Sequence, residues 1–116
     1  MLKLAPGVKL AGVQPALLAV LPIFDGLIVE LFAADARVTS GTEGVHVPGS
    51  LHGQGKALDL GIREFARDRW IDIADKLHGA LGGDGGSFKV VLETIAPAKL
   101  PSTSAWAPHI HVELVG

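Results

Sequence analysis

The sequence predicts an α+β domain in which a small antiparallel sheet is flanked by helices, with a metal site on one sheet face. Two stretches repeat apolar residues at helical spacing, and several short segments alternate with the period of a strand. Helices and strands are mixed without an internal repeat, which favours α+β. A chain of 116 residues is the usual size of one domain, so we expect a single domain over 1–116.

The first predicted helix begins at Gln14-Pro15, because proline suits the first helical position. Its apolar stripe consists of Leu17, Leu18, Leu21, Phe24, Leu27, Ile28, Leu31 and Phe32. Pro22 or Gly26 is expected to kink or split it. The second predicted helix covers residues 64–81. Its inner stripe consists of Phe65, Trp70, Ile73, Ala74, Leu77 and Leu81.

Four strands are predicted, at residues 37–39, 57–62, 88–92 and 109–115. Residues 1–13 read as irregular, and 40–56 and 96–108 read as loops. Side chains alternate across a strand, so Asp59 lies on the face opposite Leu58 and Leu60. By the same alternation, His109 and His111 share a face with Glu113, opposite an aliphatic face. If the two strands are neighbours, Asp59 and His111 meet on the polar face.

Composition excludes several classes of site and partner. The absence of cysteine excludes disulfides and thiolate metal sites, and a formal charge of −2 without a basic patch argues against nucleic acid. The apolar stretch 17–34 is interrupted by Pro22, Asp25, Gly26 and Glu30, so a buried core helix is expected rather than a membrane span.

His52 precedes Asp59 by seven positions, about 10 Å along a helix, which is too far for two ligands of one ion. It must therefore reach back from a loop, and Gly53 and Gly55 supply the backbone freedom. Two imidazoles and a carboxylate form a common catalytic zinc set, in which zinc polarises a carbonyl and lowers the pKa of a bound water. Of His109 and His111, one can bind the metal while the other accepts a proton or stabilises charge.

Two motifs carry a resemblance to a known family. Ser50-x-His52-x-x-Gly55-x-Ala57-x-Asp59 matches in full the S-x-H-x-x-G-x-A-x-D signature of the M15 family of D-Ala-D-Ala metallopeptidases. His109-x-His111 matches the H-x-H motif of the wider group that joins lysostaphin, these peptidases and the hedgehog domain. The run 38–41 also looks like the T-S-G strand end of the family, and the run 90–93 looks like the strand before H-x-H in its small phage and bacterial members. The chain resembles its small phage or prophage members over most of its length.

The resemblance implies that His52, Asp59 and His111 bind one Zn²⁺ per chain and that His109 is the catalytic histidine. It implies a fold of a small antiparallel sheet with flanking helices. It also implies a zinc-dependent hydrolase of peptidoglycan stem peptides, either a D,D-carboxypeptidase or an L,D- or D,D-endopeptidase. A zinc-bound water would attack the peptide bond, with His109 as base or charge stabiliser.

The expected substrate contacts are Ser50, Gln54 and Trp106. Ser50 lines the substrate site by resemblance, whereas Trp106 is either a wall of the groove or a plain core or rim aromatic. His46 lies in the glycine-rich loop, in a loop or substrate-contact role, and His78 is expected to be a solvated histidine near the end of a helix.

The sequence departs from the family at two positions. Many members place a glutamate base in E-x-x-W-H, whereas here Pro108 precedes His109, so the base role passes to His109 or else to Glu93 or Glu113. Many members also place an arginine after S-G to hold the substrate carboxylate. Here Thr42-Glu43-Gly44 follows, which leaves Arg37, Arg63 or Lys56 as replacements and leaves endopeptidase action open.

Two other classes remain open. A non-haem iron(II) oxygenase also uses two histidines and one carboxylate, but it usually spaces its first pair as H-x-D. The second class is a zinc-binding module that keeps the fold without catalysis. The presence of His109 beside His111 argues instead for activity.

The N-terminal residues lack a signal-peptide pattern, because Lys3, Pro6 and Lys9 break their apolar run. We therefore expect synthesis in the cytoplasm and action on the cell wall after lysis, release through a pore or delivery in a virion. The peptidoglycan stem peptide is the only expected partner, and the sequence does not specify an oligomeric state.

Overall fold

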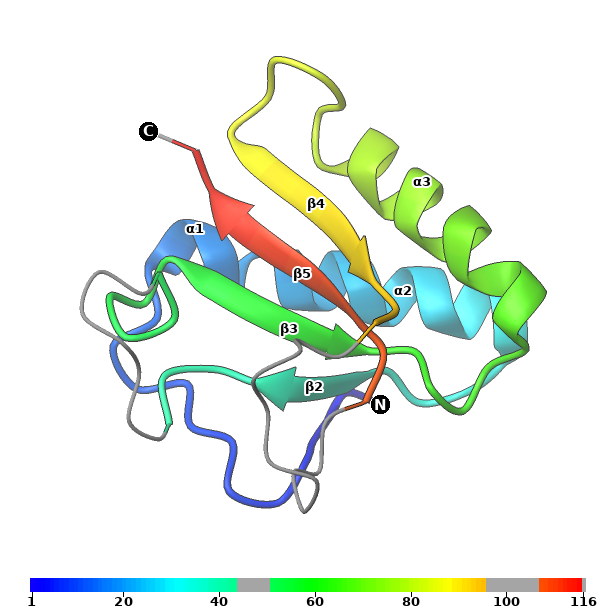
Figure 1. The fold of residues 1–116 in the computed structure, drawn as a ribbon, viewed down its shortest axis with the longest axis horizontal. Coiled ribbons are helices and arrows are strands. Elements are labelled where there is room, and N and C mark those ends of the chain that lie inside the picture. The colour runs from blue at the N-terminus through cyan, green and yellow to red at the C-terminus, as the bar shows by residue number, and fades with distance from the viewer. Residues whose placement is uncertain (44–50, 96–106, 116) are drawn as a thin grey trace.

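The computed structural model describes residues 1–43, 51–95 and 107–115. Within these residues, five strands form one sheet in the order β1-β2-β3-β5-β4. The elements are β1 (Lys3–Leu4), α1 (Pro15–Leu18), α2 (Val20–Phe32), β2 (Arg37–Ser40), β3 (Ala57–Gly61), the short 3-10 helix η1 (Arg67–Arg69), α3 (Trp70–Ala80), β4 (Phe88–Glu93) and β5 (His109–Leu114). The predicted α+β class, a small sheet with flanking helices, is confirmed (Figure 1).

The sheet is antiparallel from β2 to β4, through the pairs β2–β3, β3–β5 and β5–β4. At the other edge, β1 pairs parallel to β2, so the complete sheet is mixed. The prediction that residues 1–13 are wholly irregular is therefore wrong for Lys3 and Leu4. Two residues are too few to show alternation in the sequence. β1 forms because it pairs with the open edge of β2, and the Lys3 amide donates to the carbonyl of Ala36, just before β2, at 2.8 Å.

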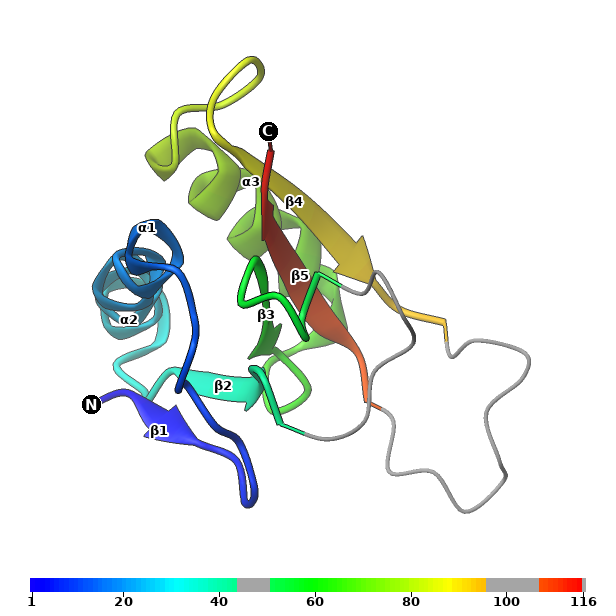
Figure 2. The same ribbon diagram turned by 90° about the vertical axis from the view of Figure 1, so that its left-hand side faces the viewer.

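One face of the sheet carries the hydrophobic core, and α1, α2 and α3 pack against it (Figures 1 and 2). The sheet contributes the fully buried side chains Val38, Leu58, Leu60, Ile110 and Val112, as the alternation predicts. The helices contribute the buried side chains Leu17, Val20, Leu21, Phe24, Ile28, Trp70, Ile73 and Leu77. The opposite face is thus left to the polar positions of β3 and β5.

The first helix begins at Pro15 and is split, as predicted, whereas the second differs from its predicted bounds. The first splits at Ala19, because Pro22 has no N–H to donate to the carbonyl of Leu18 one turn earlier. The second does not begin at residue 64. Instead the Phe65 ring stacks on Phe32 with centroids 4.4 Å apart, and the Trp70 indole donates to the Phe65 carbonyl at 3.1 Å. These contacts fix a turn at Phe65, and the α-helix begins only at Trp70.

By length and composition alone, the stretch Pro15–Phe32 could cross a membrane, with a mean hydropathy of 1.9. Core helices of soluble proteins and N-terminal signal sequences meet the same criterion. In this fold its inner face supplies Leu17, Phe24 and Ile28 to the core.

Candidate metal centre

The sheet register places the polar residues of β3 and β5 side by side. Asp59 pairs directly with His111, as predicted, and on its other side with Ser40 of β2. The His111 Nδ1 lies 2.9 Å from the Asp59 Oδ1. Both side chains are largely shielded from solvent, at 15% and 14% exposure. The two motifs therefore meet on the polar face of the sheet.

His52 joins this pair from the turn that precedes β3. Its Nε2 lies 3.3 Å from the Asp59 Oδ1. The turn folds back at Gly55, whose φ of +72° is a conformation that favours glycine. A Cβ at Gly55 would also lie only 1.9 Å from the carbonyl oxygen of Gly12. The glycine of the motif is thus required both by its backbone angle and by its close approach to the N-terminal segment.

His52, Asp59 and His111 together form a group that could hold a metal ion. One ligand atom from each lies within 4.8 Å of the other two. Zinc bonds of 2.0–2.1 Å in a tetrahedron put ligand atoms about 3.3 Å apart. The separation between His52 and Asp59 has this value, and the one between His111 and Asp59 is slightly shorter. The donor set therefore fits a metal ion with small adjustments.

The outer nitrogens of both histidines are held by the protein. The His52 Nδ1 donates to the carbonyl of Gly41 at 3.1 Å, which turns Nε2 toward Asp59. The His111 Nε2 donates to the Glu113 Oε1 at 3.1 Å, which turns Nδ1 toward Asp59. Metal-binding histidines characteristically donate their second N–H to a carbonyl or a carboxylate in this way.

The group is electrostatically coupled. Burial alone would raise the pKa of Asp59, but hydrogen bonds with His111 and His52 outweigh it and hold this pKa below its ordinary value. Burial would likewise lower the pKa of His52, yet the hydrogen bond to Asp59 leaves it raised. The hydrogen bond to Asp59 raises the pKa of His111 against the effect of burial. The site thus pairs a carboxylate whose pKa is lowered with two imidazoles whose pKa values are raised.

These shifts predict how pH acts on the metal-free protein. Because the pKa values of His52 and His111 are raised in the folded protein, these residues stabilise the fold below the ordinary histidine pKa of 6.5. This stability is lost as the pH rises through their pKa values in the folded state. Because the pKa of Asp59 is lowered in the folded protein, this residue stabilises the fold above the ordinary aspartate pKa of 3.8. This stability is lost as the pH falls through the pKa of Asp59 in the folded state. The melting temperature of EDTA-treated protein should therefore peak between about pH 4 and 6.5. Added zinc should stabilise progressively more toward pH 8, because bound imidazoles must be deprotonated. A flat metal-free profile would contradict the coupling.

His109 lies beside the metal group without belonging to it. Its Nδ1 donates to the Ala107 carbonyl at 2.8 Å. Its Nε2 lies 3.5 Å from the Asp59 Oδ2 and 3.4 Å from the Glu93 Oε2. Glu93 comes from β4, where it is the cross-strand partner of His109. The nitrogen that can exchange a proton is thus placed between two carboxylates.

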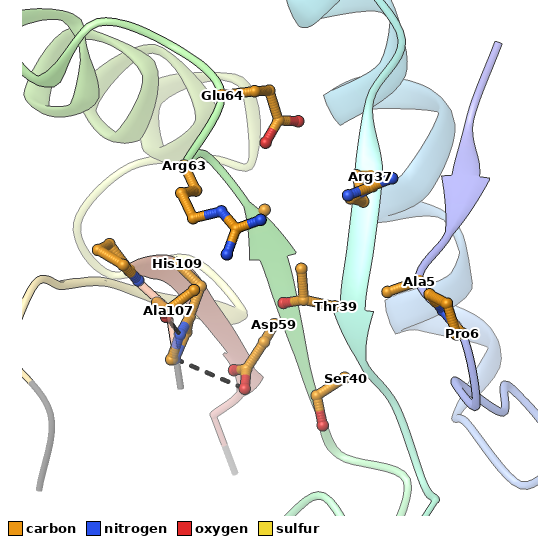
Figure 3. A pocket seen from close by; sticks show the side chains of 12 residues that line it. Ala5, Pro6, Arg37, Thr39, Ser40, Asp59, Arg63, Glu64, Ala107 and His109 are labelled. Atoms are coloured by element: carbon orange, nitrogen blue, oxygen red, sulfur yellow. Dashed lines mark hydrogen bonds and ion pairs between the residues drawn. The ribbon is translucent and has the colours of Figure 1, made fainter. Parts of the chain in front are cut away.

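A cavity of about 370 Å³ opens next to this group (Figure 3). Asp59 and His109 line one side, and Arg37, Thr39, Arg63 and Glu64 are among the residues that line the other sides. Gly61, the last residue of β3, lies between Asp59 and Arg63 in the sequence and adds no side chain to the cavity. A second cavity of about 310 Å³ shares Arg37 and Arg63.

The arginines of the cavity are available to a ligand. Among the residues that the structure describes, no carboxylate oxygen lies within 4.0 Å of the guanidinium of Arg37 or Arg63. Arg37, Arg63 and Lys56 were the candidates to replace the arginine that many M15 members place after S-G, and Arg37 and Arg63 line the cavity. Lys56 lines neither of the two cavities. The arrangement can hold an anionic group a short distance from the metal group.

The remaining predicted site residues are distributed differently. Gln54 is exposed in the turn and lines neither of these cavities, so its substrate contact stays a prediction. Ser50, His46 and Trp106 lie outside the described residues. Sequence reasoning gave Glu93 only as an alternative to His109 as base, whereas the strand phase of Glu113 already allowed it to orient His111 or His109. The structure places Glu113 against His111, two positions away on β5, and places Glu93 against His109, a contact that the register of β4 and β5 determines.

Comparison of the chain with protein-family models, with curated proteins and with solved structures finds no match. The resemblance to the M15 peptidases therefore depends on the sequence motifs alone.

Proposed function

We propose that the protein is a zinc-dependent peptidase that hydrolyses a peptide bond in bacterial peptidoglycan stem peptides. The observation that carries this proposal is a single carboxylate, Asp59, shared by three histidines. Two of them complete a metal group, and His109 lies beside it at the edge of an open cavity. The full match to the M15 signature supports the choice of zinc and of the substrate class. The protein would reach the cell wall after lysis, through a pore or in a virion.

The chemistry is hydrolysis, in which water adds to a carbonyl and an amine leaves. When bound by His52, Asp59 and His111, zinc would supply a Lewis acid that polarises the carbonyl and activates water. His109 would accept a proton at Nε2 from the attacking water and return it to the leaving amine. Glu93, 3.4 Å from the same nitrogen, would stabilise the imidazolium formed between these steps.

The cavity would hold an anionic group of the stem peptide. Stem peptides carry carboxylates at the chain end and on side chains, and guanidinium groups bind carboxylates through two parallel hydrogen bonds. Arg63 lies in the turn after β3, two positions beyond Gly61, and lines the same cavity as Asp59, so it is well placed to hold such a group (Figure 3). Arg37 would support it from β2.

Arg63→Gln should therefore lower kcat/KM about 10- to 100-fold on a stem peptide with its free carboxylates, the usual effect of a lost hydrogen bond to a charged group. Zinc affinity should be unchanged. Amidating the terminal carboxylate of one peptide and the side-chain carboxylate of another should show which of the two Arg63 contacts. On the peptide whose contacted carboxylate is amidated, the variant and the wild type should have equal kcat/KM. Arg67→Gln, which removes the same charge beside Trp70, is the matched control. An equal loss in both variants would argue against the assignment.

The proposal as a whole is tested by incubating purified peptidoglycan with the zinc-loaded protein and measuring the release of free amino groups. EDTA should abolish the release and added zinc should restore it. A protein that binds one zinc per chain and releases no amine from peptidoglycan would instead favour the zinc-binding module.

A further inference from the structure

Glu43 lies shortly after β2, in the segment where many members of the M15 family, which the chain resembles, have an arginine. Its carboxylate accepts three hydrogen bonds in the described structure. The Gly41 amide donates to Oε1 at 2.7 Å, the Lys9 amide donates to the same oxygen at 3.1 Å, and the Ser40 hydroxyl donates to Oε2 at 2.9 Å. Burial alone would raise the pKa of Glu43, but these backbone donors leave it lowered. Glu43 thus joins the end of β2 to the N-terminal segment.

This contact connects to the metal group through Gly41. The Lys9 carbonyl accepts the Thr42 amide at 2.9 Å, and this amide belongs to the same peptide unit as the Gly41 carbonyl. That carbonyl in turn accepts the Nδ1–H of His52 at 3.1 Å. The fit around Gly41 is tight, since a Cβ there would lie 2.1 Å from the Lys9 carbonyl oxygen. Glu43 and Lys9 therefore hold both peptide groups of Gly41 in place.

We infer that Glu43 is a positioning residue for the metal ion, acting through the Gly41 carbonyl on the orientation of His52. The inference rests on the metal-binding part of the proposed function and is independent of the substrate. With the carbonyl fixed, the His52 proton stays on Nδ1 and Nε2 faces Asp59. Without Glu43, the Gly41 and Lys9 amides lose their shared acceptor, and the peptide group whose carbonyl orients His52 is held only by the Lys9 carbonyl.

The test is the zinc affinity of Glu43→Ala, measured by competition with a chelator at a temperature where the metal-free variant is fully folded. The substitution removes the acceptor of both amides, whereas a glutamine would keep an acceptor in its amide oxygen. We expect zinc to bind about 10-fold more weakly, the low end of the range for losing a partner behind a metal ligand, because Glu43 acts one step further out through Gly41. In the metal-free state, the NMR signal of the His52 Nδ1–H should also shift or exchange faster with water.

The matched control is Asp72→Ala on α3, which removes a carboxylate from ion pairs with Arg69 and Lys76. It should leave zinc affinity and the His52 signal unchanged. If Glu43→Ala does not fold, Ser40→Ala removes only the hydroxyl donor to Glu43. That variant should weaken zinc binding about two- to tenfold, the range of one neutral hydrogen bond.

Two results would overturn the inference, and they differ in what they say of the function. Wild-type affinity in Glu43→Ala, with an unchanged His52 signal, would show that Glu43 does not position the ligand. Wild-type protein that binds no zinc would overturn the proposed function together with this inference.

Discussion

Asp59→Ala is expected to abolish stoichiometric zinc binding. The Asp59 Oδ1 lies within hydrogen-bond or ion-pair distance of both ligand histidines, and Oδ2 faces His109, so one carboxylate organises the whole group. Losing a direct ligand should weaken zinc binding by more than the 10- to 100-fold that the loss of an outer partner costs. Metal analysis after dialysis should find close to one zinc per wild-type chain and almost none in the variant.

The control for this prediction is Asp75→Ala, which removes an exposed carboxylate of α3 and should keep the metal. The variants His52→Ala and His111→Ala should lose zinc as Asp59→Ala does. Full zinc stoichiometry in both histidine variants would contradict the ligand assignment. Because the metal-free protein pairs the same groups with one another, the folded state of each variant should be checked by circular dichroism before metal is measured.

His109→Ala is expected to lose hydrolysis while it keeps zinc. The imidazole lies outside the metal group, with Nε2 directed at Asp59 and Glu93, so its removal takes away a proton carrier and no ligand. General acid–base catalysis contributes about 10²- to 10⁴-fold, and kcat on a stem peptide should fall by that factor. The measurement is a single-turnover assay together with zinc analysis of the same sample.

His78→Ala is the matched control for His109→Ala, because His78 lies near the end of α3 and contacts only Asp84 among the described ion pairs. It should retain wild-type activity. If His109→Ala retained activity within a factor of a few, the base role would pass to Glu93. Glu93→Gln would then show the larger loss.

The sequence predicts the centre of the site well, because alternation along two strands decides which side chains share a face. Asp59 and His111 had to lie on the polar face once their neighbours filled the core. The signature glycine of the loop likewise pointed to a turn, and Gly55 occupies one that other residues would not fit.

The surroundings of the site could not be predicted, because they depend on the order of the strands in the sheet. Glu93 reaches His109 only because β4 pairs with β5, and Arg37 and Arg63 share a cavity only because β2 lies beside β3. The contact between Glu43 and Lys9 spans 34 residues and has no local signal. The turn at Phe65 is set by stacking on Phe32, which helical periodicity does not reveal.

The most direct test of the central claim is mass spectrometry of peptidoglycan fragments after digestion by the zinc-loaded protein, with EDTA-treated protein and His109→Ala as controls. We predict a new fragment in the zinc-loaded wild type alone, with a mass that corresponds to hydrolysis of one bond of the stem peptide. The absence of any new fragment, from a protein shown to carry one zinc per chain, would contradict the claim that this metal centre is a cell-wall peptidase.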